Sequence, residues 1–151
     1  MERIEEDIFE KNLYYEREDP YALAVSVMEA ARRIAAIKEK TNKFLTSGPR
    51  EKFELTFSMK YPVDKYSRTL FLFELSGESG TRKEEITTNF IKISIKGILQ
   101  TILPGRDGFV KEVFSEYYVR KLLPGARATA RQQSTRIEKE ILNVINYVVR
   151  A

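Results

Sequence analysis

The clearest pattern in the chain is an alternation of apolar and polar residues in its middle third. Between Lys52 and Tyr61 every second residue is apolar, namely Phe53, Leu55, Phe57, Met59 and Tyr61. A period of two places these side chains on one face of a β-strand. Ser67–Leu75 repeats the alternation after a turn at Pro62–Lys65. The two segments predict an antiparallel hairpin, which needs another strand or a helix to cover its apolar face.

On both sides of the hairpin the apolar residues recur at three- and four-residue steps. This period predicts helices at Met1–Tyr15, Pro20–Phe44, Asp107–Lys121 and Ala126–Arg150. Asp19-Pro20 is a helix-start signal, because Asp caps free N–H groups and Pro suits the first helical position. Leu123-Pro124-Gly125 predicts a break between the last two helices.

The segment Glu84–Leu103 fits two patterns. Ile91, Ile93 and Ile95 alternate with polar residues, which favours a strand over Thr87–Lys96 and then a helical turn to Leu103. A helical stripe through the same segment remains the alternative.

Taken together, the predicted fold is α+β: a helical bundle built from both chain ends, with a small antiparallel β hairpin or meander inserted in the middle. The expected division is a helical domain formed by residues 1–48 and 97–151, with a β subdomain at 49–96.

The composition narrows the chemistry. The chain has no Cys and no His, so thiolate catalysis, disulfides and the commonest general base and metal ligand are excluded. Neighbouring carboxylates such as Glu84-Glu85 point apart on a helix and form no converging pair. We therefore expect a protein that is not an enzyme, with no catalytic residue, metal or cofactor. High charge of both signs without Cys is also typical of thermophile proteins.

Positive charge is concentrated toward the C-terminus. Met1–Phe90 has 15 Lys and Arg against 17 Asp and Glu, whereas Ile91–Ala151 has 11 against 5. The stretch Tyr117–Arg136 contains five basic residues and no acid, which suits contact with phosphates. The alternative is a solvated helix face. Because Tyr117 is expected to face the core, the candidate nucleic-acid-binding residues here are Tyr118 as a stacking residue and Arg120, Lys121, Arg127, Arg131 and Arg136. Arg127 and Arg131 are the sharpest candidates.

A second candidate contact lies in the Gly-rich segment Gly77–Lys83, through Arg82 and Lys83. The segment lacks the spacing of a P-loop, and a loop beside the hairpin is the preferred interpretation. Its two basic residues would then touch nucleic acid from a loop.

The first residues are too acidic for a signal peptide, and no apolar run reaches the length of a membrane span. We expect a cytoplasmic protein with no membrane partner. The predicted architecture resembles the small subunit of archaeal type I-A CRISPR Cascade complexes: both chain ends are helical, a β-containing insert lies between them, and one helical surface is basic. That resemblance implies a non-catalytic accessory subunit of a ribonucleoprotein effector in antiviral defence. It would contact the RNA or DNA backbone and other protein subunits.

The alternative is a protein-interaction subunit of a transcription or viral assembly with no nucleic-acid contact of its own. Its docking face would be the Ala-rich helix that includes Ala31 and Ala35.

Overall fold

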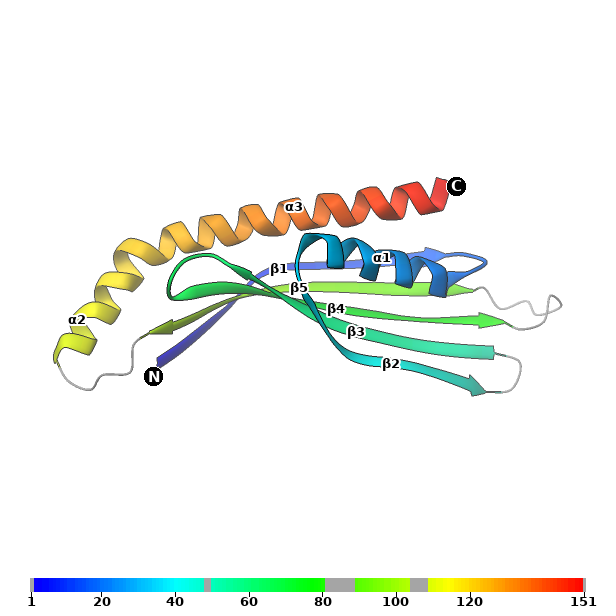
Figure 1. The fold of residues 1–151 in the computed structure, drawn as a ribbon, viewed down its shortest axis with the longest axis horizontal. Coiled ribbons are helices and arrows are strands. Elements are labelled where there is room, and N and C mark those ends of the chain that lie inside the picture. The colour runs from blue at the N-terminus through cyan, green and yellow to red at the C-terminus, as the bar shows by residue number, and fades with distance from the viewer. Residues whose placement is uncertain (1, 48–49, 81–88, 104–108, 151) are drawn as a thin grey trace.

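One five-stranded antiparallel sheet, covered on one face by two helices, forms the protein (Figure 1). The computed structural model describes residues 2–47, 50–80, 89–103 and 109–150. The strands are β1 (Glu2–Glu16), β2 (Ile37–Ser47), β3 (Arg50–Pro62), β4 (Ser67–Gly80) and β5 (Phe90–Leu103). The helices are α1 (Pro20–Ile34), α2 (Phe109–Tyr117), the π-helical turn η1 (Tyr118–Leu122) and α3 (Leu123–Arg150). The strand order is β1-β5-β4-β3-β2.

The predicted helical bundle from both chain ends is wrong, because the first fifteen described residues form a strand and the sheet is the main element. β1 and β2, which were expected to be helical, are the two edge strands of the sheet. The expected domain boundary at residues 96–97 falls inside β5. Among the described residues, the helices are therefore restricted to the layer that covers one sheet face and to α2, which lies beyond the end of the sheet (Figure 1).

The hairpin of β3 and β4 is confirmed, with Leu55 opposite Leu75 and Phe57 opposite Phe73. The strand predicted over Thr87–Lys96 is confirmed from Phe90, since Thr87 and Thr88 lie outside the described residues, and it continues to Leu103 without a helical turn. β5 continues because it pairs on both sides, with β1 and with β4. Central position in a sheet satisfies the backbone groups of every residue along it.

β1 looked helical because a β-bulge interrupts its period of two. The register shifts between Asp7 and Phe9, so Ile4 and Phe9 both face the helices although they are five residues apart. Beyond the bulge, Leu13 and Tyr15 resume the alternation and pack against the core.

The start of α1 is confirmed: Asp19 accepts a hydrogen bond from the Ala22 N–H at 3.2 Å, and Pro20 is the first helical residue. The helix ends ten residues earlier than expected, at Ile34, because Ala35 adopts extended backbone. The residues that follow form β2, an edge strand paired only with β3. Its side chains are mostly exposed and three of them are lysines, which protect a sheet edge from further pairing.

Two apolar clusters lie between the helices and the sheet. The larger joins α1 and the C-terminal half of α3 to β3, β4 and β5, and it includes Leu23, Val27, Phe57, Phe73 and Ile141. The smaller joins Tyr118, Leu123, Ala126 and Ala130 to Leu99 and Leu103 of β5. The Ala-rich face of α1 is part of the larger cluster, since Ala24 and Ala31 are fully buried. That face is thus occupied within the chain.

The expected break at Leu123-Pro124-Gly125 is replaced by a π-helical turn. The Leu123 N–H bonds to the Tyr118 carbonyl, five residues back, and α2 continues through η1 into α3. Proline lacks an N–H and clashes with the carbonyl four residues before it in a regular helix. A wider turn just before Pro124 relieves that clash without ending the helix.

Candidate nucleic-acid interface

The flank of α3 beside β1 forms ion pairs with that strand. On the flank beside β1, Arg127 makes two hydrogen bonds to the Glu6 carboxylate, at 2.7 and 2.6 Å, and Lys11 pairs with Glu138 at 3.5 Å. The Arg127 guanidinium lowers the pKa of Glu6 below its ordinary range, and the charge of Arg131 lowers it further. Arg127 therefore fixes β1 to α3, a role for which the sequence offered no signal because Glu6 lies 121 residues away.

The other basic residues of the predicted stretch differ in how far they are neutralised. Arg120 pairs with Glu116 at 2.6 Å, and Arg136 approaches Glu140 at 3.5 Å. Arg131 and Lys121 are exposed and form no ion pair with any described residue. Arg82 and Lys83, the other predicted contacts, lie outside the described residues. The two sharpest candidates therefore differ. Arg131 is accessible to a ligand, whereas Arg127 is already paired with Glu6.

The predicted orientation of the two tyrosines is wrong. Tyr118 is 0% exposed and Tyr117 is 52% exposed, so Tyr118 is not available to stack on a base. The buried stripe consists of Phe114 and Tyr118, four residues apart, both of which pack edge-on against Tyr66. The Tyr118 hydroxyl donates to Asp64 at 3.0 Å. Ser67 bonds to the same hydroxyl and to Thr101, which completes a buried chain of hydroxyls.

On the opposite flank of α3 lies a hollow of about 220 Å³ between α1, β3 and α3. Its lining residues are Ile34, Tyr61, Thr129, Gln132, Gln133, Arg136 and Ile137. The α3 members recur at three- and four-residue steps and so share one side of the helix. Gln133 is held by Thr69 at 2.8 Å and by the Pro62 carbonyl at 3.0 Å, which fixes this side of α3 to the sheet.

The hollow combines the donors that suit a phosphate group. Arg136 offers a planar fork of N–H groups and its side chain is 71% exposed. The Tyr61 and Thr129 hydroxyls and the Gln132 amide make no hydrogen bond with the described part of the chain. Ile34 and Ile137 supply apolar contacts beside these donors. The basic stretch of the sequence indicates Arg136 but not Tyr61 or Thr129, because β3 and α3 meet only in the folded chain.

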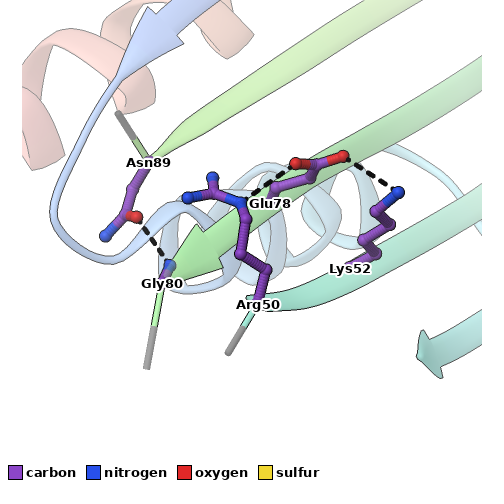
Figure 2. A network of polar contacts seen from close by, with 5 residues as sticks. All are labelled: Arg50, Lys52, Glu78, Gly80 and Asn89. Atoms are coloured by element: carbon purple, nitrogen blue, oxygen red, sulfur yellow. Dashed lines mark hydrogen bonds and ion pairs between the residues drawn. The ribbon is translucent and has the colours of Figure 1, made fainter. Parts of the chain in front are cut away.

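On the uncovered face of the sheet, positive and negative side chains are equally frequent around the two troughs described below. Near the β4–β5 end this face forms shallow troughs of about 480 and 460 Å³. Their charged residues are Lys43, Lys52, Lys92, Glu54, Glu74 and Glu78. Glu78 is held by Arg50 at 3.2 Å and by Lys52 at 3.4 Å, as Figure 2 shows. Equal numbers of opposite charges give this face no preference for a polyanion.

Asn89 closes the same end of the sheet. Its side-chain carbonyl accepts from the Gly80 N–H at 2.7 Å (Figure 2). Its amide donates to the Glu18 carbonyl at 3.1 Å. The Arg17 N–H donates to the Asn89 carbonyl at 3.0 Å. These bonds are structural, because they join three chain segments.

Within the described residues there is no group of three or more Asp and Glu side chains placed to hold a metal ion. No helix in the described part of the chain is long and apolar enough to cross a membrane.

Comparisons with known proteins do not assign the chain to a family. No protein-family model matches it, and no curated protein matches it. Among solved structures, it is similar to the quaternary ammonium Rieske monooxygenase CntA in complex with L-carnitine, at 7% identity and a TM-score of 0.23. The match covers 88% of this chain and 39% of that one. It is also similar to Ara h 8.0201, at 10% identity and a TM-score of 0.22, over 81% of this chain and 97% of that one. These scores are too low to support any argument about fold or function.

Proposed function

We propose that the protein is a non-catalytic accessory protein that contacts the phosphate backbone of a nucleic acid through its helical layer. The observation that carries the proposal is the distribution of charge between the two layers. The α1, α2, η1 and α3 segments contain ten Lys and Arg against five Asp and Glu, whereas the five strands contain eleven of each. Excess positive charge on one layer favours a polyanion over a neutral partner.

The hollow at Arg136 is the proposed centre of this contact. A phosphate there would accept hydrogen bonds from Arg136, Thr129 and Tyr61, and Arg131 would contribute charge from the other flank of α3. None of these residues is positioned to read base edges, so binding should be nearly independent of sequence. The proposal includes a cytoplasmic location, which the lack of cysteine favours.

The test is fluorescence anisotropy with labelled single-stranded RNA, single-stranded DNA and duplex DNA of scrambled sequence, titrated at several salt concentrations. We expect affinity to fall steeply with salt. Arg136→Ala should weaken binding to all sequences equally and reduce the slope of log K against log salt by ~0.7–0.9.

Lys60→Ala is the matched control, because Lys60 is an exposed cation on the uncovered sheet face. It changes the net charge by the same amount and should leave binding and slope almost unaltered. The proposal fails if the wild-type protein binds none of the three probes at low salt. It also fails if Lys60→Ala weakens binding as much as Arg136→Ala does.

A further inference from the structure

A short helical arm, α2 with η1, exposes more apolar surface than its surroundings. Four of its large hydrophobic side chains are solvent-accessible: Val113 (49%), Tyr117 (52%), Val119 (41%) and Leu122 (40%). In Figure 1 α2 lies beyond the end of the sheet, away from the larger core cluster. Concentrated exposed apolar residues on a soluble protein mark an interaction surface.

Three of these residues lie on one side of the arm. Val113 and Tyr117 are four residues apart in the α-helical part. Leu122 follows Tyr117 by five residues, which is the span of a hydrogen bond in the π-helical turn that contains it. Because this turn holds more residues than an α-helical turn, Leu122 lies nearer the side of Tyr117 than it would in a regular helix. The π turn therefore extends an apolar stripe that a regular helix would have continued with Lys121.

The net charge beside this stripe is negative at its N-terminal end and positive at its C-terminal end. The N-terminal half of the arm contains Glu112 and Glu116 against one cation, Lys111. The C-terminal half contains Arg120 and Lys121 and no acidic residue. If two such arms are placed antiparallel about a two-fold axis near Tyr117, each acidic half faces a basic half. The same placement brings Val113 of one arm opposite Leu122 of the other. The arm is thus complementary to itself in both charge and apolar character.

We propose that this arm is a self-association site at which a second copy of the chain docks antiparallel through Tyr117. The proposal goes beyond the proposed nucleic-acid contact and does not depend on it. Glu116 and Arg120, which pair within one chain at 2.6 Å, would join the second copy's Arg120 and Glu116 in a four-charge network. The arm is only about 21 Å long, so the contact is smaller than a standard interface and the dimer should dissociate on dilution.

Sedimentation velocity over a wide range of protein concentrations, without nucleic acid, tests the proposal. We expect the wild-type protein to shift from monomer to dimer as concentration rises. Glu116→Arg alone and Arg120→Glu alone each create two like-charge contacts across the axis and should weaken the dimer at least tenfold. Mixing those two variants should restore dimers, because every facing pair in the mixed dimer is again opposite in charge.

The matched control is Lys139→Glu, a charge reversal at an exposed position of α3 outside the arm. It should leave the monomer–dimer equilibrium unchanged, and circular dichroism should show that all variants keep the wild-type fold. Restoration on mixing distinguishes a second copy from any other partner. A monomer at every concentration overturns the proposal, as does a dimer that is insensitive to both arm reversals.

Discussion

At the scale of single residues, Tyr118 shows how one buried hydroxyl connects distant parts of the chain. Asp64 only accepts, so the Tyr118 O–H donates to it and the Ser67 hydroxyl must donate to Tyr118. Ser67 then accepts from Thr101. The three strand and turn residues thereby anchor the start of the α2–η1–α3 helix. Burial is the main cause of the raised pKa of Tyr118, which keeps its proton in place for this bond.

We expect Tyr118→Phe to lower the free energy of unfolding by about 1–2 kcal/mol, since Ser67 and Asp64 each lose a partner. Tyr117→Phe is the matched control, because that side chain is half exposed and forms no hydrogen bond with the described residues. Urea denaturation of both variants gives the comparison. Equal stability of the two variants would show that the buried hydroxyl chain contributes nothing.

Glu6 gives the protein a specific sensitivity to acid. Its pKa is lowered in the folded state, chiefly by the hydrogen bonds from Arg127, so the pair stabilises the fold above the ordinary carboxyl pKa of about 4.3. That contribution is lost as the pH falls through the lowered pKa. Glu6→Gln should therefore reduce Tm at pH 7, and the difference from wild type should shrink below about pH 4. A difference in Tm that stays constant down to pH 2 would contradict this assignment.

Replacement by Ala should change the stability of the protein in opposite directions at two glycines, Gly125 in α3 and Gly77 in β4. A Cβ at Gly125 meets nothing within 4 Å, so Gly125→Ala should stabilise α3 by about 0.5–1 kcal/mol. A Cβ at Gly77 would come within 2.7 Å of the Phe53 ring and still closer to the Phe90 carbonyl. Gly77→Ala should thus destabilise the sheet by ~1–3 kcal/mol. Thermal melts give the Tm of both variants. A shift of both Tm values in the same direction from wild type would contradict this prediction.

At the scale of elements, the sequence predicts the helices and strands whose apolar residues repeat at one uninterrupted spacing. β3, β4 and α3 were recognisable because apolar residues keep one period along each of them. β1 has a helix-like pattern because its bulge places Ile8 and Phe9, as well as Ile4, against the apolar clusters, and Ile4 and Ile8 are four residues apart. β2 was misread because it has little apolar alternation of its own and forms by pairing with β3. For an edge strand of this kind, tertiary context overrides local propensity.

The candidate site was predictable only where one helix supplies it. Arg136 and Arg131 follow from the basic stretch, and helical spacing places Arg136 on the same side of α3 as Thr129, where both line the hollow. The engagement of Arg127 by Glu6 was not predictable, because it depends on β1 being a strand that lies beside α3. The reversal of Tyr117 and Tyr118 has a similar cause, since the aromatic partner that buries Tyr118 is Tyr66 in the β3–β4 turn.

The Ala-rich face of α1 gives a prediction at this scale. Ala31 is fully buried within the layer formed by α1, α3 and the sheet. Ala31→Leu should then overpack the core and lower the free energy of unfolding by ~1–3 kcal/mol. Ala22→Leu, at an exposed position of the same helix, should have little effect. Chemical denaturation distinguishes these outcomes, and an Ala31→Leu variant of wild-type stability would return this face to consideration as a docking surface.

At the scale of the whole molecule, the two edge strands are supported unequally. β1 is attached to α3 through Glu6 and Lys11, and its C-terminal end is tied down through the bond between Arg17 and Asn89. β2 pairs with β3 alone, and from Lys38 to Thr46 nearly every side chain is exposed. Local opening should follow this difference, because segments with few buried apolar contacts open at the lowest free energy.

Amide hydrogen exchange measured by NMR therefore should show three levels of protection. Amides of β4, which lies between β3 and β5, should exchange most slowly, and those of β1 should be intermediate. Amides of β2 that bond to β3 should exchange at least about tenfold faster than those of β4. Glu6→Gln should raise the exchange rates of the β1 amides toward those of β2 and leave those of β4 unchanged. The substitution weakens the attachment of β1 to α3, although the pair between Lys11 and Glu138 is kept. Equal protection of β2 and β4 in the wild-type protein would mean that the edge strand opens only when the whole domain unfolds, and that its exposed side chains do not set its stability.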